Sequence, residues 1–370
     1  MSGQGIKVLI AGGGTGGHFF SGVAVGEAVL ARHEDNRVVY VGTKGGIEAR
    51  VGPAQGLEVR YVNISGIKGK GLVPKLKAVL RIPLAMLQSL VLILKERPGF
   101  VVGVGGYASG PVVLAARLLG LKTGVVEQNS VAGVTNRILG KFVHKVFIAF
   151  EPARSYFPPR KVLFTGNPIR EGVVQLLTLE STGTVGVGNR FKLLVVGGSQ
   201  GSRAINEGMM AMVAAAPQAL KDVLYIVHQT GAKDEQRVRE AYEAAGVQAK
   251  VHPFIEAMAE AYRMADLVVC RAGALTVSEL TISRRASLLI PFPYATDNHQ
   301  EVNAGTLVDA GAGEMLLEKD LSGEKLLEVF QRLNADRKAI QRMAWNAGAG
   351  ARPAAAAEVV DEMYKLIGRP

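Results

Sequence analysis

Cysteine is almost absent from this chain of 370 residues. The single cysteine, Cys270, directly follows the apolar residues Leu267, Val268 and Val269. One thiol can form neither a disulfide framework nor a cysteine-based metal site, so the sequence excludes both. A chain built without disulfides is typical of a reducing compartment, and we expect a cytoplasmic protein.

Long hydrophobic runs are also missing. The longest apolar stretch, Ile82 to Leu94, is interrupted by Pro83, Gln88 and Ser89, and it falls short of the roughly 20 residues that a membrane-spanning helix needs. The amino terminus carries only the strand-length run Ile6 to Ala11, which passes into glycines. A secretory signal would have a charged segment and a longer apolar core. We therefore expect neither a membrane span nor export.

Acidic residues are absent from Val59 to Lys95, in a chain whose formal net charge is +11. Basic side chains alternate there with aliphatic ones, the combination by which an interfacial segment binds anionic lipid. The alternative is a core helix with a solvated basic face, while the scarcity of aromatic residues argues against a nucleic acid partner. We expect an anionic membrane surface as the partner, contacted by Lys68, Lys70, Leu72, Lys75, Leu76, Lys77, Leu80 and Arg81.

Short apolar runs of strand length alternate with helical stretches, from residues 38–41 to 162–164 and again from 191–196 to 314–317. Strands that alternate with helices form parallel sheets covered on both faces. We therefore predict an α/β protein of two doubly wound, Rossmann-like domains, residues 1–168 and 169–344. Open sheets of this kind bind ligands at the carboxyl ends of their strands, so we expect the domains to face each other across a cleft that holds the site.

The stretch AGGGTGGHFF, residues 11–20, joins a predicted strand to a predicted helix. Its glycines match the G-x-G-x-x-G spacing of dinucleotide-binding loops. The next strand, however, ends in VGTK, residues 41–44, without the carboxylate that holds a nicotinamide ribose. His18 stands where a P-loop has its lysine, which disfavours ATP hydrolysis. A nicotinamide oxidoreductase and a noncatalytic basic binding module remain alternatives.

Two further glycine turns lie in the second half. Residues 197–201, GGSQG, follow a strand and begin a helix, so backbone N–H groups, the helix dipole and the Ser199 hydroxyl suit a diphosphate. The alternative is a bend whose serine caps the helix. Residues 270–279 form the second turn and end in Glu279, whose carboxylate can accept two hydrogen bonds from a ribose diol. Thr276 and Glu279 also match a capping box, which needs no ligand.

Motifs in collinear order carry a resemblance to a known family. They are GGGTGGH (12–18), GGYASGP (105–111), EQNSVAGVTNR (127–137), TGNPIR (165–170), GGSQGS (197–202), CRAGALTVSEL (270–280) and PFPYATDNHQEVNA (291–304). Together they resemble the MurG family of bacterial N-acetylglucosaminyltransferases. The set is far more specific than any single glycine loop. Ser21 and His299 depart from the proline and glutamine that are usual in the family.

The resemblance implies a GT-B fold and an inverting hexosyltransferase. The enzyme would move N-acetylglucosamine from UDP-N-acetylglucosamine to the C4 hydroxyl of the muramoyl sugar of lipid I, giving lipid II, without a cofactor. The acceptor would lie on the first domain and the donor mainly on the second, with a final helix in residues 345–370 packing back on the first. The resemblance implies roles in peptidoglycan synthesis, cell-wall biogenesis, cell shape and cell division. The location implied is peripheral, on the cytoplasmic face of the cell inner membrane, with other wall-synthesis enzymes as further partners.

The resemblance also implies the residues that bind the donor. The Ile255 backbone would read the uracil, Glu279 would hold the ribose, and Gln300 would hold the sugar hydroxyls. The full set is Thr15, Gly16, Gly17, Asn129, Arg170, Ser199, Ile255, Ala274, Leu275, Thr276, Val277, Ser278, Glu279 and Gln300.

Transfer to a hydroxyl needs a general base and stabilisation of the departing diphosphate. His18 is the candidate base, because the positive end of the predicted helix keeps its imidazole neutral. Glu127 could assist or replace it. Arg170 and the Ser199 loop would neutralise the leaving group. The chain has no D-x-D triplet and no spaced cluster of histidine, cysteine and carboxylate, so we expect no metal site.

Overall fold

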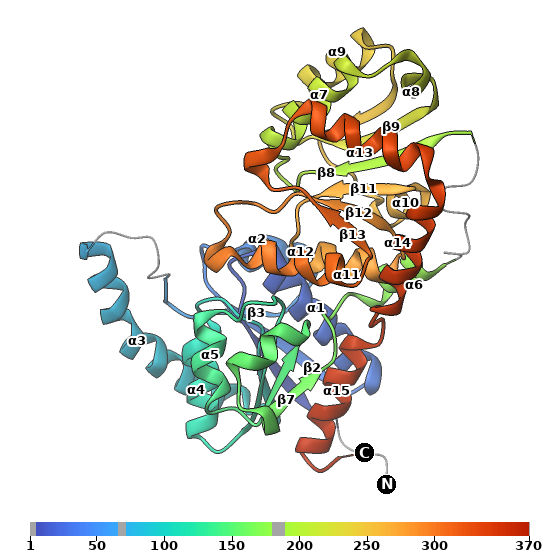
Figure 1. The fold of residues 1–370 in the computed structure, drawn as a ribbon. Coiled ribbons are helices and arrows are strands. Elements are labelled where there is room, and N and C mark those ends of the chain that lie inside the picture. Colours follow the sequence, from blue (N-terminus) through green and yellow to red (C-terminus); the bar gives the residue numbers. More distant parts are fainter. Residues whose placement is uncertain (1–4, 66–71, 180–188, 370) are drawn as a thin grey trace. The chain divides into compact units, whose positions relative to one another are not determined.

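The chain folds into two compact units. In the computed structural model, residues 5–65, 72–179 and 189–369 are described, with the side chains of residues 72–80 left out. The first unit comprises residues 1–171 and 352–370, and the second comprises residues 172–351. Both are drawn in Figure 1.

The first unit is built on a seven-stranded parallel sheet of order β3-β2-β1-β4-β5-β6-β7. Its five inner strands are mostly buried apolar runs, as expected where helices cover both faces of a parallel sheet, whereas the edge strands β3 and β7 are only partly buried. The strands are β1 (Lys7–Ala11), β2 (Arg37–Gly42), β3 (Val59–Tyr61), β4 (Phe100–Gly103), β5 (Lys122–Glu127), β6 (Lys145–Ile148) and β7 (Val162–Phe164). The helices are α1 (Gly16–Arg32), α2 (Ile47–Ala54), α3 (Leu72–Glu96), α4 (Ser109–Leu118) and α5 (Val134–Gly140), followed by the short η1 (Glu151–Tyr156) and η2 (Pro159–Lys161).

The last helix of the chain, α15 (Ala355–Leu366), belongs to the first unit and packs against α1. Its residues Val359 and Met363 are buried in the same apolar cluster as Val8 of β1. The Asn36 amide donates a hydrogen bond to the Tyr364 hydroxyl at 2.7 Å. The final helix that we expected within residues 345–370 is therefore α15, whereas the preceding α14 (Arg337–Ala349) belongs to the second unit.

The second unit holds a six-stranded parallel sheet of order β10-β9-β8-β11-β12-β13. The strands are β8 (Phe191–Val196), β9 (Leu224–Gln229), β10 (Gln248–His252), β11 (Leu267–Cys270), β12 (Ala286–Leu289) and β13 (Gly313–Met315). Its helices are α7 (Arg203–Ala215), α8 (Gln218–Val223), α9 (Glu235–Ala244), α10 (Met258–Met264), α11 (Ala274–Ile282), α12 (His299–Asp309), α13 (Gly323–Ala335) and α14, with the short η3 (Thr296–Asn298) and η4 (Glu318–Asp320). The helix α6 (Glu171–Thr178) spans the boundary between the units, which lies after its first residue.

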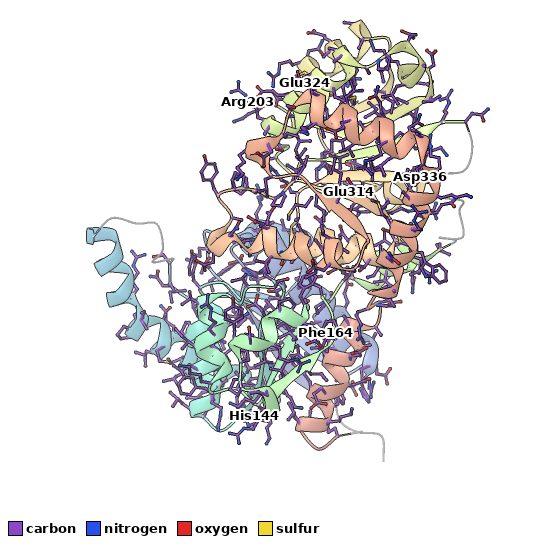
Figure 2. All side chains as sticks on the ribbon, viewed as in Figure 1. His144, Phe164, Arg203, Glu314, Glu324 and Asp336 are labelled. Atoms are coloured by element: carbon purple, nitrogen blue, oxygen red, sulfur yellow. The ribbon has the colours of Figure 1, made fainter. Side chains whose placement is uncertain are left out.

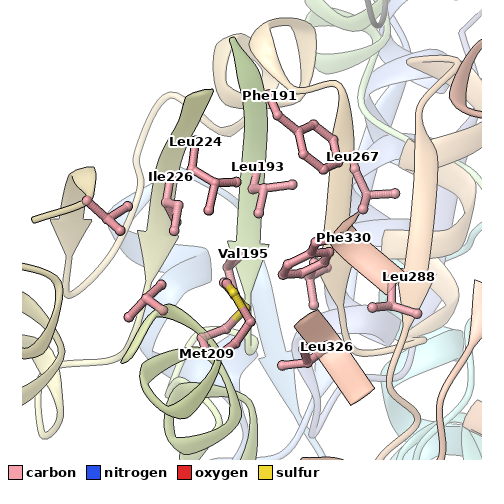
Figure 3. Close-up of a cluster of buried hydrophobic side chains, with 14 of the residues drawn as sticks. Phe191, Leu193, Val195, Met209, Leu224, Ile226, Leu267, Leu288, Leu326 and Phe330 are labelled. Atoms are coloured by element: carbon pink, nitrogen blue, oxygen red, sulfur yellow. The ribbon is translucent and has the colours of Figure 1, made fainter. Parts of the chain in front are cut away.

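One face of the second sheet packs on α7 and α13 around a closed apolar core (Figure 3). Phe191, Leu193 and Val195 alternate along β8 and point to this face, as the pleat of a strand requires. They meet Met209 of α7 and Phe330 of α13. The prediction of two doubly wound parallel-sheet domains is confirmed. None of the helices described here is both long and apolar enough to cross a membrane.

Candidate functional site

The glycine turn after β1 is held by a carboxylate of its own unit. Glu48 of α2 is buried, and its Oε2 accepts the Gly14 N–H at 2.8 Å. Its Oε1 accepts the N–H and the hydroxyl of Thr43 at 2.7 and 3.1 Å. A Cβ added to Gly13 would lie 2.3 Å from Glu48 Oε2, so the glycine makes room for the carboxylate. In dinucleotide-binding folds the N–H groups of this turn bind a phosphate. Here the Glu48 carboxylate accepts the Gly14 N–H instead.

His18 lies in the first turn of α1, where Thr15 is the N-cap residue. Its Nδ1 is 3.1 Å from the Thr15 hydroxyl oxygen. On the other side, Gly105 has a φ of +88°, and a Cβ there would lie 2.9 Å from His18 Nε2. The Gly13 N–H donates to the Gly105 carbonyl at 3.3 Å. The glycine turns that contain Gly13 and Gly105 therefore define the position of this imidazole.

Glu127 ends β5 and is buried. Its carboxylate accepts hydrogen bonds from the Asn129 N–H and the Gly133 N–H, each at 3.0 Å, and from the Asn136 amide at 2.9 Å. Burial raises the pKa of Glu127, and these hydrogen bonds oppose the rise. The carboxylate therefore fixes the turn between β5 and α5.

Arg170 is paired within the first unit. Its Nε and Nη2 both lie 2.7 Å from Glu27 Oε1. Its guanidinium remains partly exposed, at 41% of the side chain. The group predicted to face the diphosphate thus has a carboxylate partner on α1 in this structure.

A pocket of about 480 Å³ opens in the second unit beside the start of α7, where Figure 2 labels Arg203. It brings together the two glycine turns of this unit and a loop after β12. Of the predicted donor residues, Thr276 and Gln300 line it, whereas Val277 and Ser278 are buried in α11. The lining residues are Gly197, Gly198, Gly201, Ser202, Arg203, Ala204, Arg271, Gly273, Thr276, Phe292, Gln300 and Glu318.

Arg271 organises this pocket. Its guanidinium donates to the Ser202 hydroxyl at 2.7 Å and pairs with Glu318. It also lies over the Phe292 ring, 5.4 Å from the centroid. Ser202 is the N-cap of α7 and accepts the Ile205 N–H. The helix is therefore capped by Ser202, while Ser199 lies exposed in the loop before it.

Glu279 lies in the middle of α11, whose N-cap is Gly273. The capping-box alternative is therefore wrong, because Thr276 is already inside the helix. The Tyr262 hydroxyl donates to Glu279 Oε2 at 3.1 Å. Burial raises the pKa of Glu279 to about 7, against the lowering effect of the Tyr262 hydrogen bond.

Two backbone N–H groups near the predicted donor residues are bound by glutamine side chains. The Gln300 Oε1 accepts the Phe292 N–H at 3.0 Å. The N–H of Ile255, whose backbone was predicted to read the uracil, donates to Gln229 Oε1 at 2.8 Å. Gln229 was not among the predicted residues. Within the described part of the chain, no three histidine, cysteine, aspartate or glutamate side chains gather into a possible metal site.

Comparison with known proteins covers both units. Residues 8–148 match the glycosyltransferase family 28 N-terminal domain, and residues 192–359 match the glycosyltransferase family 28 C-terminal domain. The chain is 49% identical to the UDP-N-acetylglucosamine–N-acetylmuramyl-(pentapeptide) pyrophosphoryl-undecaprenol N-acetylglucosamine transferase of Myxococcus xanthus, over 98% of this chain and 93% of that protein. It is 46% identical to the protein of the same name from Syntrophus aciditrophicus, over 98% and 99% respectively. The crystal structure of Acinetobacter baumannii MurG has a TM-score of 0.81 and 32% identity, over 97% of this chain and 99% of that one.

Proposed function

The chain belongs to glycosyltransferase family 28 and, within it, to the MurG N-acetylglucosaminyltransferases, and we propose from that premise how its residues divide the reaction. The enzyme has the GT-B architecture of two Rossmann-like domains. It transfers N-acetylglucosamine from UDP-N-acetylglucosamine to lipid I and so forms lipid II. The two units carry different parts of this chemistry.

The second unit binds the donor. The observation that carries this assignment is the pocket beside α7, where the glycine turn and the capped helix start face the same space as Thr276 and Gln300. Backbone N–H groups and the positive helix end suit the diphosphate. Glu279 accepts hydrogen bonds from the ribose diol, and the Ile255 segment faces the uracil. Thr15, Gly16, Gly17, Asn129, Ser199, Ala274 and Leu275 remain predicted contacts of the donor.

His18 is the general base for the acceptor hydroxyl. In the tautomer where Nδ1–H donates to the Thr15 hydroxyl, Nε2 carries the lone pair and can accept a proton. Direct attack by the C4 hydroxyl breaks the bond from the anomeric carbon to UDP and inverts that carbon. Glu127 acts as a positioning group, because its carboxylate is buried and already accepts hydrogen bonds from the turn that follows it.

The departing UDP gains negative charge as its bond to the sugar lengthens, and preorganised donors stabilise that charge most. The α7 helix start and the Ser199 loop supply such donors. Arg170 adds a positive charge once it is released from Glu27. No step of this scheme is assigned to a metal ion.

A membrane-facing surface lies on α3 of the first unit. Leu84, Leu87, Val91 and Leu94 are 46%, 58%, 59% and 61% exposed, and their spacing places them on one helix face. We call these four residues the α3 surface. The opposite face of α3 carries the buried Ala85, Ser89 and Ile93. The helix packs against α4 (Figure 1).

The α3 surface is flanked by the exposed Arg81 and Lys95. Apolar burial and attraction to anionic lipid would act together there. This combination supports a peripheral location on the cytoplasmic face of the membrane. Lys68 and Lys70 lie outside the described residues, as do the side chains of Leu72, Lys75, Leu76, Lys77 and Leu80.

The deciding experiment supplies radiolabelled UDP-N-acetylglucosamine and lipid I in detergent and measures lipid II. We expect His18→Gln to lower kcat by about 100-fold or more, the usual contribution of a general base, with the KM for the donor nearly unchanged. His33→Gln, at the C-cap of the same helix, serves as the matched control. Normal turnover by His18→Gln would reject the base assignment. Thermal stabilisation by NADPH instead of UDP would favour the oxidoreductase alternative.

A further inference from the structure

Gln229 lies buried at the end of β9, between the diphosphate turn and the segment that precedes α10. Its Nε2 donates to the Gly198 carbonyl at 2.9 Å, and its Oε1 accepts the Ile255 N–H at 2.8 Å. A carbonyl can only accept and an N–H can only donate. The two partners therefore fix the orientation of the side-chain amide, and one residue connects both loops.

The contact with Gly198 sets the direction of the next peptide group. In a trans peptide the C=O and the following N–H point in opposite directions, so the Ser199 N–H points away from Gln229. Gly198 lines the pocket and has a φ of +98°. Glycine tolerates many backbone conformations, and a flipped peptide would present an acceptor to a diphosphate. The Gly198 carbonyl accepts from the Gln229 amide and also from the Gly201 N–H, at 3.0 Å. Together these two donors hold the peptide with the Ser199 N–H outward.

The contact with Ile255 acts in the same way on the other loop. Because the Ile255 N–H points at Gln229, the Phe254 carbonyl points away from it. An acceptor at that position suits the N3–H of uracil and opposes the bare N3 of cytosine. With the uracil at this segment, as proposed above, the direction of the 254–255 peptide would favour uracil over cytosine.

The backbones of the turns around Gln229 lie so close together that only glycine fits at two positions. A Cβ added to Gly201 would lie 1.8 Å from the Thr230 carbonyl oxygen. A Cβ added to Gly231 would lie 2.2 Å from the Gln200 carbonyl oxygen. The Thr230 N–H donates to the His252 carbonyl at 3.0 Å, which ties the same turn to the end of β10. The diphosphate turn and the 252–255 segment are therefore both anchored to the residues at the end of β9.

We propose that Gln229 is a positioning residue that couples recognition of the diphosphate to the choice of uracil. The inference rests on the proposed binding of the donor by the second unit. It assigns no contact between Gln229 and the ligand. Its effect passes through the two peptide groups that the side chain orients.

The test compares Gln229→Met and Gln229→Glu in the full chain by titration with UDP, CDP and uridine. Gln229→Met removes both hydrogen bonds at similar size. We expect it to weaken UDP binding about tenfold, the effect of roughly one buried hydrogen bond, and to reduce the preference for UDP over CDP by a similar factor. Gln229→Glu keeps the acceptor for Ile255 but places a carboxylate oxygen beside the Gly198 carbonyl. UDP binding should fall about tenfold while uridine binding stays unchanged.

The control is Gln236→Met, which removes an exposed glutamine of α9 whose amide donates to Glu240. Both Gln229 variants should raise the KM for UDP-N-acetylglucosamine more than they lower kcat. Wild-type UDP affinity and an unchanged UDP-to-CDP ratio in Gln229→Met would overturn the proposal, as would equal losses of UDP and uridine binding in Gln229→Glu. If Gln229→Met does not fold, the comparison of UDP and uridine binding by Gln229→Glu tests the proposal by itself. Failure of the unmodified enzyme to bind UDP would instead reject the donor assignment itself.

Discussion

Burial raises the pKa of Glu279 to about 7, so this carboxyl changes its charge close to neutral pH. A ribose diol donates two hydrogen bonds, which the ionised carboxylate accepts better than the protonated acid. Donor binding should therefore weaken as pH falls through 7. We expect the Kd for UDP-N-acetylglucosamine to be about tenfold higher at pH 6 than at pH 8, measured by calorimetric titration. The sugar nucleotide is preferred to UDP because it lacks the terminal phosphate that ionises in the same range.

Glu279→Gln is the control for that titration, because it keeps the shape of the side chain and removes its ionisation. Its Kd should be higher at pH 8 and should not change down to pH 6. The same pH slope in Glu279→Gln and in the unmodified enzyme would assign the ionisation to another group.

Glu48 is expected to stabilise the turn that carries His18. In Glu48→Gln the amide NH₂ replaces one oxygen and faces a backbone N–H of Gly14 or Thr43, so one buried donor loses its partner. We expect a loss of about 1–3 kcal/mol in the free energy of unfolding, measured by urea denaturation, and a fall in kcat. Glu34→Gln, at an exposed position of the same unit, should change neither. Unchanged stability in Glu48→Gln would show that this carboxylate does not hold the turn.

The residues that the sequence did not reveal act across long separations in the chain. Arg271 reaches Ser202, 69 positions away, and Glu48 reaches Gly14, 34 positions away. Local patterns report caps and turns within a few residues, so they suggested Ser199 and a Thr276–Glu279 box as caps. The partner of each group depends on how the strands are ordered in the sheet. Glycine turns indicated the candidate site, but not which side chains hold those turns in shape.

At the scale of elements, α3 provides a testable surface. Replacing Leu87 and Val91 by glutamate would place two negative charges on the α3 surface, which is exposed in the folded chain. We expect binding to vesicles of anionic lipid to fall at least about tenfold, because apolar burial is lost and lipid repels the new charges. Sedimentation with vesicles measures the binding, and circular dichroism confirms the fold. Leu30→Glu, at another exposed leucine of the unit, is the matched control, and equal binding by all three proteins would contradict a membrane role for α3.

Strands were the elements most readily predicted. A strand in a parallel sheet is buried on both faces, so residues such as those of β1 and β8 form continuous apolar runs. Which unit each helix near the end of the chain joins is less readable from local composition. Residues 337–366 have a similar alanine-rich composition throughout, yet α14 and α15 belong to different units. The surface that a helix covers decides which unit it joins. The surface of α1 that α15 covers is far from α15 in the sequence, so local composition does not reveal it.

At the scale of the whole molecule, the two units differ in how the chain supplies their cores. The second unit is one continuous segment, and its apolar cluster runs from Phe191 to Ile340. The first unit is discontinuous, because Val359, Val360 and Met363 of α15 complete its cluster. Each such side chain, when fully buried, contributes roughly 1.5–3 kcal/mol. Loss of α15 would therefore remove a large fraction of the stability that a domain of this size has.

The fragment 172–351 should fold by itself, bind UDP and lack transfer activity, since His18 is on the other unit. The fragment 1–171 should fail to give a cooperative unfolding transition, whereas 1–171 joined to 352–370 by a flexible glycine-serine linker should regain it. Circular dichroism during thermal unfolding and UDP titration measure both expectations. Tyr364→Phe in the joined fragment removes the hydroxyl that accepts from Asn36, and it should lower the midpoint slightly without abolishing the transition. A cooperative, stable 1–171 fragment would mean that α15 only covers a core that is already complete.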